Sequence, residues 1–203
     1  MNAAACRRSA GPISSTEMRI IAGEARSRQI DAPKGRDTRP TLDRVRENLF
    51  NIIARSVPGA RVLDLFSGSG ALSLEALSRG AAEAVLVDRD REAHRVERLN
   101  AERLGYADRT QILLTDALSA CARLTGEGRK FDLIFLDPPY AVGDLRDVTG
   151  ALLPLMAEDA LVVTEHEAGR PYTVCEGLEA TDTRRWGYAG MTFYRWAKEA
   201  EEA

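Results

Sequence analysis

The chain contains the segment Arg61-Val-Leu-Asp64-Leu-Phe66-Ser67-Gly68-Ser-Gly70-Ala-Leu-Ser73-Leu-Glu-Ala-Leu-Ser78. It opens with an apolar run typical of a buried strand and closes with the composition of a helix. Between them, Gly68 and Gly70 let the backbone approach a ligand where a Cβ atom would block it. A strand, a glycine turn and a helix predict the ligand-binding edge of an open α/β sheet, although a turn kept only for helix–strand packing has the same pattern.

Strands and helices alternate from residue 61 onward, which predicts βαβ units around a parallel sheet. We expect strands at 61–65, 84–88, 110–114, 131–136 and 160–165, and helices at 71–78, 90–104, 117–124 and 145–155. The alternation then stops. Residues 178–186 and 191–196 predict two strands joined by Gly187-Tyr-Ala-Gly190, an antiparallel hairpin at the edge of the sheet,.

The region before residue 59 has a different organisation. Residues 1–17 have no apolar periodicity and predict a disordered extension,. A short hairpin is expected between Met18 and Ile30, and a helix capped by Thr41 should follow and end before Pro58. We therefore expect a single domain over 18–203, made of an N-terminal arm and helix (18–58) and an α/β core (59–198).

Charge is distributed unevenly along the 203 residues. Residues 1–60 hold eleven Lys and Arg against six Asp and Glu, whereas residues 61–203 hold seventeen against twenty-five. A basic arm on an acidic body suits a polyanionic partner, and a solvated charged face would have the same composition.

Composition excludes several classes of protein. No apolar run approaches the roughly 20 residues that a membrane-spanning helix needs, and the first residues do not form a secretory signal. The three cysteines, Cys6, Cys121 and Cys175, are scattered, which fits a reducing cytoplasm,. His94 and His166 have no metal-ligand spacing around them, so we expect no metal site.

Three carboxylates follow predicted strands and suit a nucleoside ligand. Asp64 precedes the glycine turn, where a negative charge is unfavourable beside a pyrophosphate but favourable beside a sulfonium and an ammonium group. Asp88 lies about 20 residues past the glycine turn, where a carboxylate can reach ribose hydroxyls,. Asp116 could accept a hydrogen bond from an adenine amino group, or it could simply cap the next helix. Ser73 stands where a dinucleotide fingerprint would need Gly or Ala.

The segment Phe131-Asp-Leu-Ile-Phe-Leu-Asp137-Pro138-Pro139-Tyr140 favours S-adenosylmethionine over a dinucleotide. The lone pair of a guanine amino group is delocalised into the ring, and acceptors placed on its two hydrogens would free that lone pair for methylation. Asp137 and the Pro138 carbonyl can be those acceptors, because the prolines offer no competing N–H. Tyr140 can stack on the base. A bare turn remains the alternative for an isolated Asp-Pro-Pro.

The strand-end carboxylates and Asp137-Pro138-Pro139-Tyr140 resemble the RsmD family, which are bacterial 16S ribosomal RNA guanine-N2 methyltransferases. Three further segments share the resemblance: Ile20-Ile-Ala-Gly23, Thr38-Arg39-Pro40-Thr41-Leu-Asp-Arg44-Val-Arg46-Glu-Asn-Leu-Phe50 and Leu65-Phe-Ser-Gly-Ser-Gly-Ala-Leu72. The resemblance covers Met18 to Trp196. It implies a class I methyltransferase domain with a Rossmann-like sheet of seven mostly parallel strands whose last strand is antiparallel. One departure is Ser27, because the family usually has Gly before the second arginine of Arg26-Ser27-Arg28.

The resemblance also implies a site and a substrate. The target guanine of 16S rRNA in an assembling 30S subunit is expected at Asp137, Pro138, Pro139 and Tyr140. The expected cofactor contacts are Asp64, Phe66, Ser67, Gly68, Gly70, Asp88, Arg89, Asp116 and Ala117. The expected RNA contacts are Arg26, Arg28, Lys34, Arg36, Arg39, Arg44 and Arg46.

Three rival functions share parts of these patterns. A DNA amino-methyltransferase also uses Asp-Pro-Pro-Tyr, but the short spacers here leave no room for a target-recognition domain. A protein-glutamine methyltransferase more often has Asn at position 137. A non-catalytic RNA-binding assembly factor would not need an intact Asp137 or the intact glycine turn.

Overall fold

The computed structural model describes residues 18–33, 40–139 and 143–197. The predicted extension 1–17 and the predicted site residues Lys34, Arg36, Arg39 and Tyr140 lie outside the described residues.

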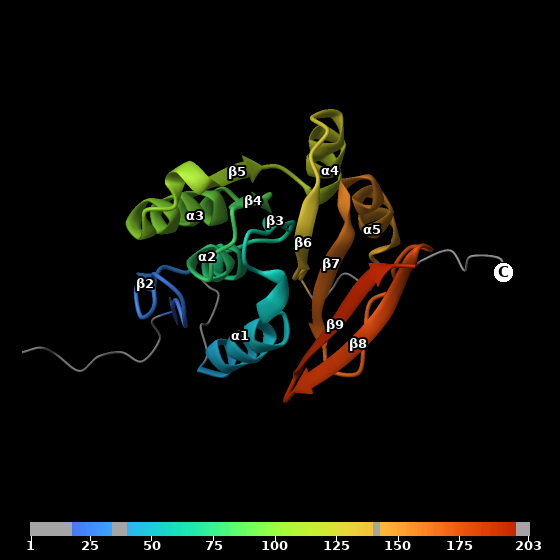
Figure 1. Ribbon diagram of the computed structural model, residues 1–203, viewed down its shortest axis with the longest axis horizontal. Helices are drawn as coiled ribbons and strands as arrows, with labels where there is room; N and C mark the ends of the chain where they lie inside the picture. The colour runs from blue at the N-terminus through green and yellow to red at the C-terminus, as the bar shows by residue number, and fades with distance from the viewer. Residues whose placement is uncertain (1–17, 34–39, 140–142, 198–203) are drawn as a thin grey trace, which may run out of the picture.

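One seven-stranded sheet organises the molecule (Figure 1). Its strands, in spatial order, are β5 (Thr110–Leu114), β4 (Glu83–Asp88), β3 (Arg61–Asp64), β6 (Phe131–Leu136), β7 (Met156–Glu167), β9 (Ala189–Trp196) and β8 (Leu178–Trp186). The pairs from β5 to β7 are parallel, and β9 runs antiparallel to both β7 and β8. The mostly parallel sheet with an antiparallel last strand is therefore confirmed, and the chain order reverses between β3 and β6, where such sheets bind ligands.

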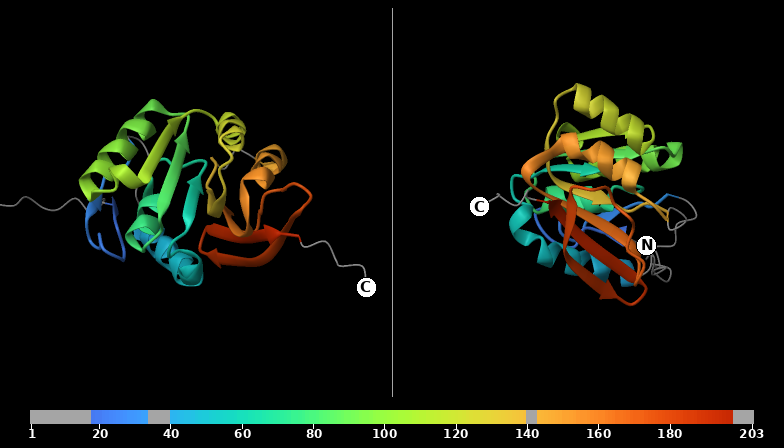
Figure 2. Two further views of the ribbon diagram at one scale, coloured as in Figure 1. Left: turned by 45° about the horizontal axis from the view of Figure 1, so that its top comes forward. Right: turned by 90° about the vertical axis from the view of Figure 1, so that its right-hand side faces the viewer.

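Helices cover both faces of the sheet (Figure 2). The first hydrophobic cluster joins one face to α1 (Pro40–Ile52), α2 (Ala71–Ser78) and the end of α3 (Arg91–Leu104). The second joins the other face to α4 (Ala117–Gly126) and α5 (Arg146–Leu152). Short 3₁₀ turns occupy Ala54–Ser56, Ala107–Arg109 and Leu153–Leu155.

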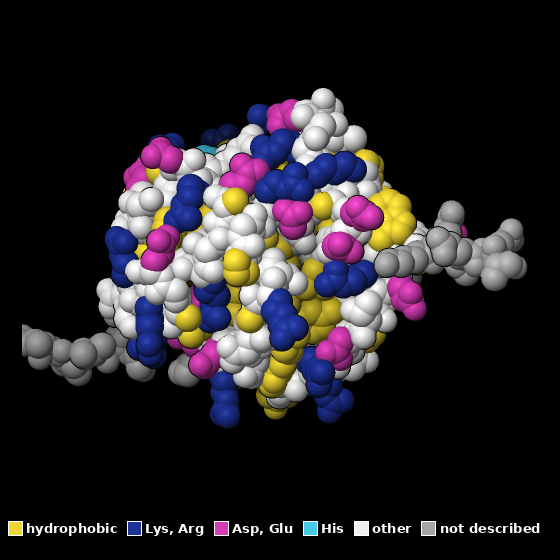
Figure 3. Space-filling view, in the orientation of Figure 1, with side chains coloured by type: hydrophobic (Ala, Val, Ile, Leu, Met, Phe, Trp, Pro, Cys, Tyr) yellow, Lys and Arg dark blue, Asp and Glu magenta, His cyan; other side chains and the backbone are white. Residues whose placement is uncertain are grey.

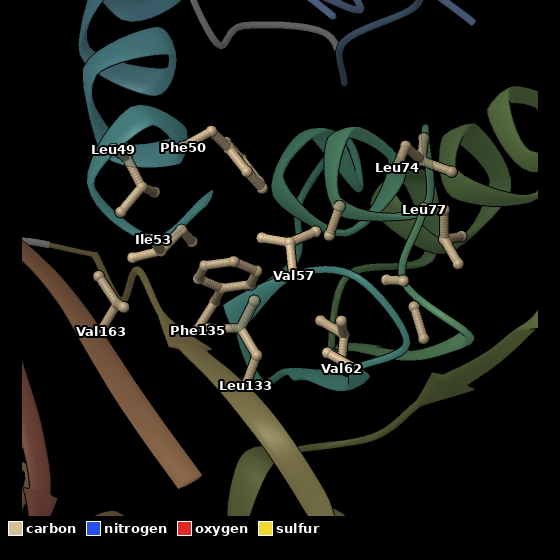
Figure 4. Packing of buried hydrophobic residues seen from close by; sticks show 14 of the residues in the cluster. Leu49, Phe50, Ile53, Val57, Val62, Leu74, Leu77, Leu133, Phe135 and Val163 are labelled. Carbon is tan, nitrogen blue, oxygen red and sulfur yellow. The ribbon is translucent and has the colours of Figure 1, made fainter. Parts of the chain in front are cut away.

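The first cluster holds α1 against the sheet (Figure 4). Phe50 on α1 and Phe135 on β6 are fully buried, and their ring centroids lie 6.1 Å apart. Leu49 on the helix and Ile53, just after its end, are buried in the same cluster. Burying large apolar side chains supplies roughly 1.5–3 kcal/mol each, so this contact fixes α1 beside the carboxyl ends of β3, β6 and β7.

Most element boundaries lie within one or two residues of the predicted ones, and the larger or more informative differences are the following. The first helix starts at Pro40 itself, whose fixed φ suits a first helical position, rather than after a Thr41 cap,. The helix expected over 145–155 becomes α5 plus a 3₁₀ turn, because Pro154 cannot continue the α-helical hydrogen bonds,. β7 is longer than 160–165, and the turn before β9 needs only Gly187 and Tyr188, with Gly187 at a φ of 63°.

The N-terminal hairpin, β1 (Met18–Arg19) paired with β2 (Gln29–Ile30), is confirmed and is anchored on α2. The Glu75 carboxylate accepts hydrogen bonds from the backbone N–H groups of Ile21 at 2.7 Å and Ala22 at 3.0 Å. Ser27 takes a φ of 66°, so the left-handed position forms without the glycine that the resembled family usually has there. Among the described residues, no helix is both long and apolar enough to cross a bilayer.

Candidate functional site

A pocket of about 160 Å³ opens at the carboxyl ends of the central strands. It brings together predicted cofactor residues (Asp64, Phe66 and Ser67) and the predicted catalytic Asp137. The remaining wall comes from the N-terminal hairpin and the residues after it, from the glycine turn, from α1 and α2, and from β7 and β9: Met18, Ala32, Pro33, Val45, Arg46, Ser69, Ala71, Leu72, Glu165 and Met191.

Asp64 ends β3 and is 1% exposed. Ser73 donates a 3.1 Å hydrogen bond to its Oδ2, whereas Oδ1 has no hydrogen-bond partner in the described part of the chain. Burial, together with the charges of Glu97 and Asp137, raises the pKa of Asp64 to about 8 against the hydrogen bond from Ser73. A buried carboxylate oxygen without a donor is the feature expected where a cationic ligand group binds.

Two acidic side chains accept hydrogen bonds from the glycine turn. Gly68 donates its backbone N–H to Asp88 Oδ2 at 3.0 Å, and Ser67 donates its hydroxyl to Glu97. Gly70 caps α2 with a φ of 76°, and a Cβ there would lie 2.8 Å from the Leu86 side chain. The positive φ and the close Leu86 side chain explain the glycine at position 70, and the hydrogen bond from Gly68 places Asp88 beside the turn, as the ribose interpretation needs.

The other predicted cofactor residues lie at the neighbouring strand ends. Asp116 caps α4, accepting from the Ser119 backbone at 2.9 Å and from its hydroxyl at 2.7 Å. These hydrogen bonds hold the pKa of Asp116 below its usual range, so the capping role is present whether or not a ligand also binds. Ala117 is buried at the start of α4, and Arg89 is exposed after β4.

Asp137 and Asp64 reach one pocket because of strand register. Asp64 pairs with Phe135 on the adjacent strand, and Asp137, two residues further and just past the end of that strand, continues on the same face of the sheet,. Pro138 is buried and Pro139 is exposed. The two predicted sites, for the cofactor and for the base, are therefore contiguous around this pocket.

Glu165 was not predicted from the sequence. Leu136 pairs with Thr164, so Glu165 on β7 continues the register beside Asp137. Burial, with the charge of Asp137, raises the pKa of Glu165 to about 8. The signal was available, because Glu165 ends a predicted strand as Asp64 and Asp88 do.

Glu97 is a second residue that the sequence did not reveal. It is fully buried within α3, and burial raises its pKa to about 7 against the hydrogen bond from Ser67. Most residues near Glu97 in the sequence are charged. A helix of that composition is expected to face solvent, so the sequence did not indicate a buried carboxylate there.

The predicted RNA-contacting arginines separate into different environments. Arg26 and Arg44 are exposed. Arg28 donates to two backbone carbonyl oxygens at the end of α3, those of Arg103 and, at 3.0 Å, Leu104.

Arg46 departs from its predicted position on the RNA-facing surface. It is only 5% exposed and lines the pocket. It lies three and four residues before the buried Leu49 and Phe50, so it shares their side of the helix. Arg46 therefore lies in the pocket wall, away from the exposed arginines with which the sequence prediction grouped it.

Dark-blue Lys and Arg side chains on the face in Figure 3 alternate with magenta Asp and Glu side chains. This view shows no continuous basic patch over the described residues, so charge alone does not mark an RNA surface on this side. In the described ranges, no group of three His, Cys, Asp or Glu residues is placed to hold a metal ion.

Comparison with known proteins agrees with this geometry. A family model described as "Conserved hypothetical protein 95" matches residues 18–195. Ribosomal RNA small subunit methyltransferase D of Escherichia coli (strain K12) is 39% identical over 157 residues, which are 75% of this chain and 76% of that protein. YlbH of Bacillus subtilis (strain 168) is 37% identical over 182 residues, 88% of this chain and 98% of that protein.

Solved structures show the same architecture. The yhhF protein of Escherichia coli matches with a TM-score of 0.77 and 34% identity, covering 90% of this chain and 99% of that one. SMU.776, a protein solved in complex with SAH, matches with a TM-score of 0.69 over 92% of this chain and 57% of its own, at 17% identity, and supports the fold alone. From the family match, the identities and the pocket, we conclude that the chain belongs to the RsmD family of S-adenosylmethionine-dependent methyltransferases.

Proposed function

We propose that this protein methylates the exocyclic N2 amino group of a guanine in 16S ribosomal RNA, within an assembling 30S subunit. The observation that carries the proposal is the contiguity of Asp64 and Asp137 in one pocket. The name of the Escherichia coli relative supports ribosomal RNA of the small subunit as the substrate. Such a substrate would place the protein in the cytoplasm.

The residues divide the work between binding and activation. When bound, S-adenosylmethionine supplies a methyl group on a positively charged sulfur, and the acidic pocket favours that charge. Asp137 accepts a hydrogen bond from the guanine amino group and holds its lone pair toward the methyl group. The amino nitrogen would form its bond to the methyl carbon as the sulfur–carbon bond breaks, which leaves a neutral thioether. The nearby carboxylates would stabilise the positive charge on the methylated nitrogen, which would then lose its proton to one of them or to water.

The chemistry expected of Asp137 and Pro138 supports an exocyclic amino group as the target, and the choice of guanine rests on the resemblance to the RsmD family. An amino group with two hydrogens can donate to a carboxylate and to a carbonyl together, and the buried Pro138 has no N–H to compete for either acceptor,. Tyr140 would stack on a base that has left its helix.

The test uses small subunits from cells that lack the RsmD relative, with radiolabelled S-adenosylmethionine and nucleoside analysis of the digested rRNA. We expect N2-methylguanosine as the product. Asp137→Ala should lower single-turnover rates by something like 10²–10³-fold, as when one positioned polar group is lost elsewhere, while cofactor affinity changes much less. Asp108→Ala, which removes an exposed acid that does not line the pocket, is the matched control.

Two results would refute this function. Methylation of an adenine or of duplex DNA would show that the base or the polymer is wrong. Near-normal turnover by Asp137→Ala would show that this carboxylate does not hold the reacting amino group.

A further inference from the structure

Arg46 is a buried cation with an unused donor. Its Nη2 donates to Asp43 Oδ1 at 3.0 Å and to the Arg19 carbonyl oxygen. Its Nε has no hydrogen-bond acceptor among the described residues, although the side chain is 6% exposed. An N–H of a guanidinium group that has left water without an acceptor is costly, so its persistence calls for an explanation.

The nearest carboxylate does not supply that acceptor. Glu75 Oε2 lies 4.0 Å from Arg46 Nε and already accepts the backbone N–H of Ile21. Glu75 Oε1 accepts from Ala22 and, at 2.7 Å, from Arg79 Nε. Glu75 is thus neutralised by Arg79 and occupied by the N-terminal hairpin, which leaves the Nε of Arg46 available.

Asp64 is the opposite case in the same pocket. It is a buried anion with one unused acceptor, Oδ1, and it lines the pocket wall together with Arg46. The pocket therefore has an unused donor on a cation from α1 and an unused acceptor on an anion from β3. An α-amino acid group has the complementary pair, a carboxylate and an ammonium.

We propose that Arg46 binds the α-carboxylate of the methionine part of S-adenosylmethionine, while Asp64 binds its ammonium group. The inference rests on the cofactor and not on guanine N2, so it can be tested without RNA. It gives Arg46 a different role from the RNA contact that the sequence predicted. It also makes the position of α1 part of the cofactor site.

Calorimetry with three ligands isolates the carboxylate contact. The ligands are S-adenosylmethionine, its decarboxylated form, and 5′-methylthioadenosine, which lacks the whole amino-acid group. The wild-type protein should prefer S-adenosylmethionine to the decarboxylated form by about tenfold or more, the scale of one charge-assisted hydrogen bond. Arg46→Gln should largely abolish that preference and leave methylthioadenosine affinity within about twofold of wild type.

Arg44→Gln is the matched control, because Arg44 is an exposed arginine on the same helix. It should keep the full preference for the carboxylated ligand. If Arg46→Gln does not fold, Arg46→Lys keeps the charge but loses the Nε–H, and it should show a reduced preference.

Three outcomes would overturn the proposal. If the role of Arg46 is purely structural, Arg46→Gln would bind all three ligands more weakly and keep the preference for S-adenosylmethionine over its decarboxylated form. A role in RNA binding would lower RNA affinity with the preference unchanged. A fully retained preference in a folded Arg46→Lys variant would exclude a contact through Nε.

Discussion

At the scale of the residue, the Asp64 carboxylate is expected to lower the stability of the ligand-free protein at alkaline pH while it favours binding of S-adenosylmethionine. The Asp64 carboxylate is 1% exposed, has an oxygen without a hydrogen-bond partner in the described residues, and has a pKa near 8. A group whose pKa is raised in the folded state holds its proton more tightly there than in the unfolded chain. Its contribution to the free energy of unfolding therefore falls as pH rises from about 4 to about 8,.

We expect Asp64→Asn to stabilise the ligand-free protein at alkaline pH, because the amide carries no charge to bury. The gain in Tm over wild type should be small near pH 4 and should grow until about pH 8,. The same variant should bind S-adenosylmethionine more weakly, since the ammonium loses its counter-ion. Thermal melts across this pH range, with calorimetry at pH 8, check both halves. A variant that is less stable than wild type at every pH would refute the argument.

Tyr140 lies outside the described residues, so its role is a prediction from the sequence. Stacking on the target base would contribute roughly 1–3 kcal/mol, and it needs the ring rather than the hydroxyl. Tyr140→Ala should therefore lower methylation of small subunits severely, and Tyr140→Phe only mildly. Equal loss in the two variants would point to the hydroxyl and away from stacking.

At the scale of the element, the N-terminal hairpin depends on a close approach to α2. Gly23 has a φ of 84°, and a Cβ on it would lie 1.8 Å from the Ser78 carbonyl oxygen. The backbone N–H of Glu24 donates to that oxygen at 2.8 Å. The hairpin contributes Met18 to the pocket, so its attachment affects the site as well as the fold.

Gly23→Ala should lower the free energy of unfolding clearly more than Gly59→Ala does. Gly59 also has a positive φ, 75°, but no atom lies within 4 Å of a Cβ placed there. The Gly59 change should cost about 1–2 kcal/mol, the penalty of left-handed backbone for a residue with a Cβ. Gly23→Ala adds a collision with backbone that cannot move cheaply. Denaturant unfolding of both variants measures the difference, and equal costs would show that the hairpin can shift away from α2.

At the scale of the whole molecule, the net charge is positive before residue 61 and negative over the remainder. Arg36 and Arg39 lie outside the described residues, in the part of the sequence between a hairpin and a helix that both line the pocket. An RNA substrate that reaches Asp137 would pass these elements. The charges on the face in Figure 3 are mixed, and the sequence prediction assigns phosphate contacts to Arg36 and Arg39.

Replacing Arg36 and Arg39 with Ala should weaken binding to small-subunit RNA and flatten its dependence on salt, because fewer counterions are released. Affinity for S-adenosylmethionine should not change. The control is the double change Arg95→Ala and Arg98→Ala, which removes the same charge from exposed positions on α3. Filter binding over a range of salt concentrations measures how steeply RNA affinity falls with salt. An equal effect of the control would show that Arg36 and Arg39 act only through the overall charge of the protein.

The sequence by itself determined the alternating strands and helices, the glycine turn and the positions of Asp64, Asp88 and Asp137 at strand ends. These features are encoded locally, in the period of apolar residues and in glycines and prolines with special backbone conformations. The sequence also determined that Ser73 breaks a dinucleotide fingerprint. Local patterns also predicted the antiparallel hairpin at the sheet edge, whereas the resemblance to a family supplied the proposed rRNA substrate.

Only the tertiary structure decided which charged residues share the pocket. Arg44 and Arg46 are two positions apart on α1, so they point to nearly opposite sides of the helix, and packing against β6 decides which one is buried,. Strand register brings Glu165 beside Asp137. Glu97 accepts a hydrogen bond from Ser67, which is thirty residues away in the sequence. Whether a charge faces water or a ligand depends on contacts between distant segments, and no local pattern in the sequence records those contacts.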